Sequence, residues 1–469
     1  MRSNPALFLV FSMLSIFSTA ACTVGPDYKR PLVTLPDVYR GASGVNGSPA
    51  SAPSLGDEKW FDVFEDDQLR SLMTTAIQQN FDVRIAASRV LQAQAQFGIV
   101  RADQFPTVQG GVNSTRDRQP DSLRSAAVET GALQVGVAAA WELDFWGKFR
   151  RATEAARAEV LASEWGRRAV LTSLVGQVAG AYFQLRALDL DLDIATRTVA
   201  SRRESLRLTE LRAQGGATSV LDVRQAEQLV FGATAEIADL ERQIAQQENF
   251  ISTLLGTMPG SVPRGRSLTD QPHAPEVPVG LPSALLERRP DIAQAEQQLI
   301  AANADIGAAK AAYFPQITLT GAGGFQSAAL SKLFTGPAGL WSVGGAIIQP
   351  LFTAGRTRSR VELARARREE ATLIYQQTIQ QSLRDVSDAL VAYRKGRELR
   401  EQLQLLEGSA GDARRLADLR YQGGATSYLE VLDSDTRLFS AELDLAQAQL
   451  SELLALVQIY RSLGGGWQN

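Results

Sequence analysis

The chain has 469 residues and a formal net charge of −3, and its 48 basic and 51 acidic residues are mixed along its length. Clustered Lys and Arg, the mark of a nucleic-acid-binding surface, are absent, so we expect no nucleic-acid partner. The single cysteine, Cys22, and the single histidine, His273, exclude an internal disulfide and zinc sites built from Cys and His. His273 lies in a Pro-rich stretch and is interpreted as a solvated linker residue. With no nucleophile, base or metal cluster in view, we expect no enzymatic activity, no metal and no cofactor.

The N-terminus predicts an export signal over residues 1–21. Arg2 is followed by an apolar run (6–17), and the small residues Ala20 and Ala21 precede Cys22. The apolar run is shorter than the ~20 residues that a membrane-spanning helix needs. A cysteine directly after such a segment resembles a bacterial lipobox, in which Cys22 is acylated (a palmitate-carrying lipoprotein) and becomes the first mature residue. Ordinary cleavage that leaves a free cysteine is the alternative. Thr23 at the next position favours delivery to the outer membrane.

An internal repeat organises the rest of the chain. Residues 207–223 (RLTELRAQGGATSVLDV) and 415–431 (RLADLRYQGGATSYLEV) share twelve of seventeen positions at an offset of 208. The same offset, within one residue, recurs upstream. The predicted organisation is an N-terminal extension that carries the lipid (22–65), a first repeat (66–258), a linker (259–282) and a second repeat (283–469).

Each repeat predicts a helical stretch that ends at Phe-Pro, then a pair of strands, then very long helices without proline. In chain order these are 68–103, strands over about 106–146 and helices over 147–256, and then 283–312, strands over about 315–352 and helices over 355–463. A helix over 147–212 would extend about 100 Å at 1.5 Å per residue. Helices of this length must pack along one another in coiled-coil-like layers.

The predicted strands alternate. In the second strand, apolar Leu133, Val135, Val137, Ala139 and Trp141 are separated by small or polar residues. This pattern is also typical of a soluble, half-buried sheet. However, strands of about ten residues match the length that crosses a bilayer at a tilt of about 45°. Aromatic residues gather at the strand ends, as in an interfacial girdle. These are Phe105, Trp141, Phe145, Trp146, Phe314, Trp341 and Phe352.

Four strands cannot close into a barrel, and an open edge cannot face lipid because its backbone groups would lack partners. If the strands cross a membrane, several chains must share one barrel. The sequence therefore predicts an oligomer but leaves the number of chains open.

The two QGGATS segments predict helix–turn–helix tips. Paired glycines permit the left-handed backbone that a sharp reversal needs. Ser219 and Ser427 are placed to cap the following helices, and Asp222 and Glu430 stand at capping-box spacing.

The chain resembles the outer membrane factors, the TolC-type efflux and secretion channels, in their NodT-like lipoprotein branch. The resemblance covers nearly the whole chain. It rests on residues 22–31 (CTVGPDYKRP), on Arg289-Pro290-Asp291 with Phe314-Pro315, on the duplicated QGGATS, and on residues 463–467 (LGGGW). It implies a mainly α fold with a transmembrane β part: a trimeric α-helical barrel plus a shared 12-stranded β-barrel, with four strands per chain. The implied partners are the other two chains of the homotrimer, a periplasmic adaptor, an inner-membrane transporter of the RND type and outer-membrane lipid.

The same resemblance implies roles for particular residues. Glu430 and Asp433 would line the periplasmic aperture, where threefold symmetry would gather six negative charges and favour cations. Tyr421 would help to tie the closed state. The adaptor would contact the tips at four small residues, Gly216, Ala217, Gly424 and Ala425.

The expected function is the outer-membrane exit duct of a tripartite pump for drugs or other small toxic solutes, which would confer antibiotic resistance. A close alternative is the exit duct of a type I protein-secretion system. An alternative of another class is a structural periplasmic lipoprotein that does not conduct.

Overall fold

The computed structural model describes residues 23–40, 54–57, 63, 65–119, 128–271 and 282–467. The expected signal peptide and the lipidation site Cys22 lie outside these residues. The chain forms two compact units, each built from three segments. Unit 1 comprises Met1–Leu32, Arg89–Ser163 and Gln294–Tyr375, and unit 2 comprises Val33–Ser88, Glu164–Ala293 and Gln376–Asn469. Each unit therefore draws on both copies of the sequence repeat.

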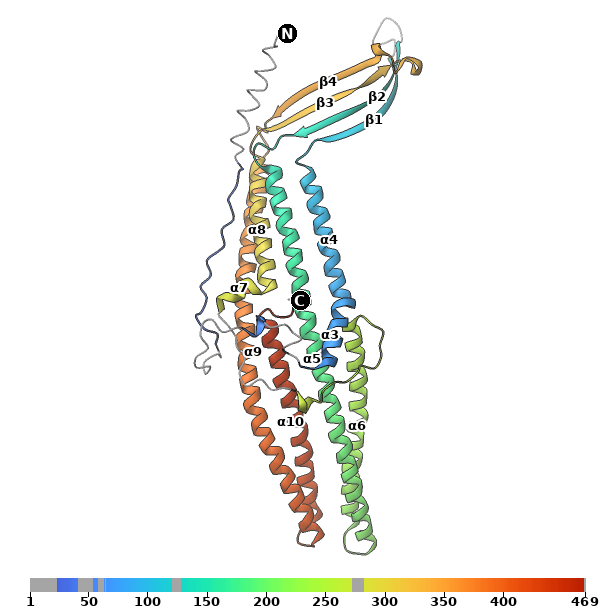
Figure 1. Cartoon of the computed structure of the whole chain (residues 1–469), viewed down its shortest axis with the longest axis vertical. Coiled ribbons are helices and arrows are strands. Elements are labelled where there is room, and N and C mark those ends of the chain that lie inside the picture. The colour runs from blue at the N-terminus through green and yellow to red at the C-terminus, as the bar shows by residue number, and fades with distance from the viewer. Residues whose placement is uncertain are drawn as a thin grey trace. The chain divides into compact units, whose positions relative to one another are not determined.

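Unit 1 contains a four-stranded antiparallel sheet in the order β1-β2-β3-β4 (Figure 1). Its strands are β1 (Thr107–Gln119), β2 (Val128–Glu142), β3 (Gln316–Ser327) and β4 (Gly339–Ile348). The two copies meet where β2 pairs with β3, with Gly136 opposite Gly324. A Cβ atom on Gly136 would lie 2.7 Å from the Gly323 carbonyl oxygen. Glycine is therefore required for the strands to approach this closely.

The register gives the sheet one apolar and one polar face. Cross-strand partners share a face, and the pairs Val112–Val135, Val135–Phe325, Trp141–Leu319 and Ile317–Ile347 all fall on the same one. The opposite face carries mainly small and polar residues such as Gln134, Thr318, Thr320 and Gln326. Several apolar side chains are strongly exposed: Val108 69%, Val112 71%, Trp341 81%, Val343 81% and Ile347 71%. The predicted period-two alternation is thus present, and its apolar side is uncovered in the single chain.

The long helices are α5 (Lys148–Gln214) and α9 (Arg356–Gln422), each of 67 residues, followed by α6 (Val220–Leu255) and α10 (Tyr428–Ser462). Before the strands lie α3 (Asp67–Gln79) and α4 (Phe81–Ala102) in the first copy, and α7 (Leu285–Arg288) and α8 (Pro290–Ala311) in the second. Short 3-10 turns are η2 (Leu55–Asp57), η4 (Leu268–Asp270), η5 (Pro282–Ala284), η6 (Leu330–Lys332) and η7 (Gly336–Ala338). Within the described part of the chain, no helix is both long and apolar enough to span a membrane.

Arg289 explains the Arg-Pro-Asp motif at the start of α8. Pro290 occupies the first helical position, where its missing N–H is not needed. The buried guanidinium of Arg289 pairs with Asp291 at 2.6 Å and with Asp385 at 3.4 Å, and donates to the Ser462 carbonyl at 3.1 Å. This one side chain therefore joins the start of α8 to the middle of α9 and to the C-terminal end of α10, within unit 2.

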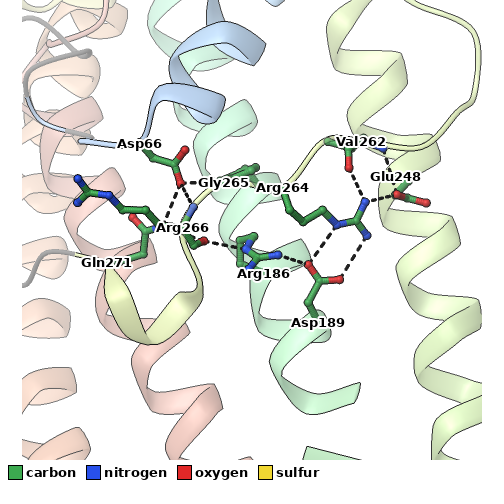
Figure 2. Close-up of polar contacts among 10 residues, drawn as sticks. Asp66, Arg186, Asp189, Glu248, Val262, Arg264, Gly265, Arg266 and Gln271 are labelled. Carbon is green, nitrogen blue, oxygen red and sulfur yellow. Dashed lines mark hydrogen bonds and ion pairs between the residues drawn. The ribbon is translucent and has the colours of Figure 1, made fainter. Parts of the chain in front are cut away.

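Asp66 is the polar centre of unit 2 (Figure 2). It caps α3 by accepting from the Gln68 and Leu69 amides at 2.9 and 3.2 Å. Its other oxygen accepts from the Tyr182 hydroxyl at 2.9 Å, the Arg266 amide at 3.0 Å and Gln271 at 3.2 Å. Burial raises the pKa of Asp66, but these hydrogen bonds outweigh burial and hold the pKa below its usual value.

Arg264 fastens the segment that follows α6. Its guanidinium pairs with Asp189 on α5 at 3.2 Å and with Glu248 on α6. Arg186 on α5 donates to the Arg266 carbonyl at 2.9 Å (Figure 2). The described part of the predicted linker is thus bound to two helices of the first copy.

We expect Asp66→Asn to lower the free energy of unfolding by about 2–3 kcal/mol, because its amide would face three donors that now share one carboxylate oxygen. Thermal melting followed by circular dichroism measures the change, and Asp67→Asn, at a neighbour 98% exposed, is the matched control. Since the pKa of Asp66 is lowered in the fold, the wild-type advantage is present at neutral pH and shrinks as pH falls through that pKa. An equal effect of both variants would refute the central role of Asp66.

Candidate functional site

Two helix hairpins in unit 2, α5–α6 and α9–α10, end in the duplicated tips at the same end of the unit (Figure 1). In the first tip the Ala217 amide donates to the Arg212 carbonyl at 2.8 Å, and the Gly216 amide donates to the Ala213 carbonyl at 3.0 Å. This pair of bonds is a Schellman motif. Gly216 has φ +70°, the left-handed conformation that favours glycine.

The second tip repeats the same geometry. Ala425 donates to the Arg420 carbonyl at 2.8 Å and Gly424 to the Tyr421 carbonyl at 3.0 Å, with φ +74° at Gly424. Gly216, Ala217, Gly424 and Ala425 are all exposed. Their assignment to an adaptor contact stays a prediction.

The helix caps differ between the copies. Ser219 and Asp222 form the expected capping box: the Asp222 amide donates to Ser219 Oγ at 3.3 Å, and the Ser219 amide donates to Asp222 Oδ2 at 3.2 Å. The Thr218 hydroxyl also donates to Asp222 and is the main cause of its lowered pKa.

Ser427 occupies the matching N-cap position, but its side chain makes no capping hydrogen bond, so the prediction of a serine cap is wrong here. Glu430 is one methylene longer than Asp222. Its carboxylate accepts from the Thr426 hydroxyl and from Arg420 at 2.8 Å instead of closing the box.

Arg212 joins the two hairpins. It donates to the Tyr421 carbonyl at 3.2 Å and to the Gln422 carbonyl at 3.1 Å, at the C-terminus of α9. A cation there interacts favourably with the helix dipole. The same guanidinium lies 4.6 Å from the centre of the Tyr421 ring. The first tip is thus tied to the second through the end of α9.

Tyr421 is buried, 7% exposed, and its ring lies 5.2 Å from the ring of Tyr428. Its hydroxyl has no hydrogen-bond partner among the described residues. The inter-helix hydrogen bond is made by Tyr428, whose hydroxyl lies 3.1 Å from Ser205 Oγ on α5. Near the tips, a tyrosine hydrogen bond between the hairpins is therefore made by Tyr428, and the predicted role of Tyr421 in the closed state stays a prediction.

Glu430 and Asp433 line one groove of about 520 Å³ between α9 and α10. Each carboxylate has an arginine partner on its own chain: Arg420 for Glu430 and Arg437 for Asp433, both at 2.8 Å. The two acids share a face, as their spacing predicts. Arg420 and Arg437 therefore offset the negative charge that Glu430 and Asp433 were expected to bring to the aperture.

The model of the family described as "Outer membrane efflux protein" matches residues 72–257 and 281–465. The chain belongs to this family. The efflux protein is 37% identical to the solvent efflux pump outer membrane protein SrpC of Pseudomonas putida over 467 residues, which cover 98% of each chain. It is 33% identical to the cation efflux system protein CusC of Escherichia coli, covering 99% of this chain and all of that one.

The solved structure of the outer-membrane channel OprN superimposes with a TM-score of 0.89 at 32% identity, over 96% of this chain and 100% of that one. The predicted family, the predicted fold class and the outer membrane as the location are confirmed. The protein is an outer-membrane component of an efflux system.

Sequence reasoning missed the buried pair that also holds the two hairpins of this efflux protein together. Arg202 on α5 and Asp435 on α10 are 2.7 Å apart with side chains 7% and 10% exposed. Arg202 also donates to the Leu229 carbonyl at 3.0 Å. The repeat offered no signal, because alanine stands at position 410, the equivalent of Arg202.

Four exposed leucines around the tips were also missed. Leu211 and Leu221 in the first tip are 51% and 64% exposed, and their equivalents Leu419 and Leu429 are 55% and 63% exposed. Their presence in both copies was the available signal.

We expect Ser219→Ala to speed hydrogen exchange of the Asp222 amide about fivefold, since losing an N-cap costs about 1 kcal/mol. Ser427→Ala should leave exchange of the Glu430 amide unchanged, because Ser427 Oγ caps nothing. Hydrogen–deuterium exchange by mass spectrometry compares the two. Equal acceleration at both tips would contradict the difference between the caps.

Proposed function

We propose that the protein works as a homotrimer, the exit duct of a tripartite efflux pump, and carries small toxic solutes, among them antibiotics, from a periplasmic adaptor and an RND-type inner-membrane transporter to the outside. It catalyses no reaction. The observation that carries this proposal is the two-faced sheet, whose exposed apolar side suits lipid and whose polar side suits a water-filled passage.

The open sheet edges support the trimer. Within the described chain, β1 and β4 are the edge strands of a four-stranded sheet. Each edge would face lipid with unpaired backbone groups unless it paired with another chain. Three copies joined β4 to β1 would supply twelve strands and close the sheet.

The helix tips support the adaptor contact. The four leucines Leu211, Leu221, Leu419 and Leu429 flank the two turns in sequence, and each is more than half exposed, which suits an apolar contact with a protein partner. Helices of an adaptor would approach closely at Gly216 and Gly424, where a Cβ atom would meet no neighbour.

The residues after Cys22 support its lipidation. The Val24 amide donates to the Trp146 carbonyl at 3.1 Å, Asn303 donates to the Pro26 carbonyl at 2.9 Å, and Asp27 pairs with Arg151 at 2.7 Å. These contacts within unit 1 bring the chain beside the end of the sheet, where a lipid on Cys22 would enter the same membrane.

A cross-linking experiment in the native envelope tests the partners. A photoreactive residue at Leu221 or Leu429 should capture an adaptor, and purification of the complex should recover an RND transporter. The matched control is Leu399, 53% exposed on α9 away from the tip. Recovery of an ATP-driven exporter would establish type I secretion instead. If neither an adaptor nor an inner-membrane transporter is recovered and the protein shows no conductance in a planar bilayer, the structural-lipoprotein alternative is favoured.

We expect Asp433→Asn and Arg437→Gln to shift ion selectivity of the reconstituted channel in opposite directions. Loss of the acid leaves Arg437 unpaired and lowers cation preference, whereas loss of the arginine frees the Asp433 carboxylate and raises it. Reversal potentials in asymmetric salt measure the shift, with Lys395→Gln as the exposed control. If ion selectivity is unchanged in both variants, Asp433 does not line the aperture.

A further inference from the structure

The starts of α5 and α9 are equivalent in the two copies but differ in their counter-charges. In the first copy Lys148 pairs with Glu142 at 2.9 Å. Asp144 accepts from the Arg150 amide at 2.9 Å and from its guanidinium at 3.3 Å. Both carboxylates stand just before the helix, so the first cations of α5 are neutralised by the preceding strand end.

In the second copy, at the offset of 208, the cations remain and the carboxylates are gone. Arg356 and Arg358 occupy the places of Lys148 and Arg150, but Pro350 and Phe352 replace the two acids. Among the described residues, the one ion-pair partner of Arg358 is Glu362, at 2.8 Å within its own helix.

The resulting positive charge is unfavourable for α9 by itself. Residues 356–368 contain six arginines and one acid, Glu362. Cations at a helix N-terminus oppose the helix dipole, which favours anions there. An anion bound beside this first stretch of α9 would therefore be stabilised by both the side chains and the dipole.

A pocket of about 600 Å³ lies between α8 and the start of α9, entirely within unit 1. Its lining combines three cations, one acid, two aromatic rings, Val361 and one residue of the N-terminal segment: Val24, Lys310, Tyr313, Phe314, Arg358, Val361, Glu362 and Arg365. Lys310 and Arg365 have no carboxylate partner in the described part of the chain. Two unpaired cations and a partly neutralised third thus share one pocket with a single acid.

Apolar side chains follow the pocket toward the sheet along the chain. Leu351 and Phe352, between β4 and α9, are 94% and 89% exposed, and Ile347 on the apolar face of β4 is 71% exposed. A free anion would make no use of them. A phosphate group that carries acyl chains would satisfy the cations and cover these residues at the same time.

We propose that this pocket binds the phosphate headgroup of an anionic glycerophospholipid of the periplasmic leaflet, with its acyl chains along Phe352 and the apolar face of β4. The proposal rests on the proposed placement of the sheet in the outer membrane. Arginine and lysine at a membrane surface recognise such headgroups. Val24, two residues after Cys22, lines the same pocket, so the bound lipid and the lipid proposed on Cys22 would lie side by side.

Native mass spectrometry of the full-length protein in detergent tests the site with added phosphatidylglycerol or phosphatidylcholine. We expect retention of phosphatidylglycerol, with affinity falling about fivefold for each cation removed in Lys310→Gln and Arg365→Gln. Lys395→Gln, an exposed cation in unit 2, is the matched control and should leave retention unchanged.

Phe352→Asp changes the site without removing a cation. It places a carboxylate where the first copy has Asp144 and removes the apolar side chain proposed to contact the acyl chains, so both effects should reduce phosphatidylglycerol retention. Retention unaffected by any of the three variants, or equal retention of both lipids, would overturn the site. Displacement of the lipid by inorganic phosphate would show a free-anion site and overturn the lipid.

Flotation with vesicles tests membrane insertion separately from lipid binding at the pocket. A protein that fails to enter vesicles contradicts the proposed function, whatever it binds in detergent. A protein that inserts, yet shows no loss of phosphatidylglycerol in the variants, contradicts the lipid site alone.

Discussion

Pairing of backbone groups in lipid is the constraint on which the rest of the architecture depends. A strand in hydrocarbon needs a hydrogen-bonded neighbour on each side, and the described part of one chain provides four strands with two edges, β1 and β4. The apolar face formed by the register of Val112, Val135 and Phe325 is therefore useful only in an assembly that closes the sheet. Exposure of Trp341 and Val343 on the edge strand, which would be a liability in a soluble monomer, is consistent with such an assembly.

Duplication explains how one chain builds both the sheet of unit 1 and the helix tips of unit 2. The close pairing at Gly136 and Gly324 joins the strands of the two copies in one sheet, and the tips repeat the same Schellman turn at Gly216 and Gly424. Contacts between the copies, however, are asymmetric. Arg212 reaches the end of α9, and its equivalent Arg420 turns to Glu430 in its own hairpin. Because equivalent residues face different neighbours, the repeat preserves backbone geometry while its side chains diverge.

The contrast between repeated backbone geometry and differing side-chain contacts also explains what could be predicted from the sequence. Helices without proline, the alternating strands and the glycine turns depend on local conformational preferences, and they were predicted with the correct order and type. The prediction that Ser427 caps α10 was wrong because the capping geometry depends on the extra methylene of Glu430 and on its ion pair with Arg420. The Arg202–Asp435 pair and the hydrogen bonds of Asp66 with Tyr182, Arg266 and Gln271 join residues more than a hundred positions apart. The periodicity of a sequence does not predict such contacts, since they form only when distant helices and loops pack together.

The pairing of charged side chains differs between the tips and the N-terminal end of α9. Glu430 and Asp433, which look like unpaired acids in the sequence, each receive an arginine from their own chain. At the N-terminus of α9 the reverse holds: cations whose equivalents in α5 are neutralised by Glu142 and Asp144 have lost those partners to Pro350 and Phe352. A chain that pairs the exposed acids at its tips but leaves Lys310 and Arg365 without carboxylates in one pocket makes the second case the informative one. Arg365 is exposed and Lys310 is partly exposed, so water solvates both cations. The proposed ligand would add the negative charge that the chain does not place beside them, and the exposed Phe352 favours an anion that also carries acyl chains.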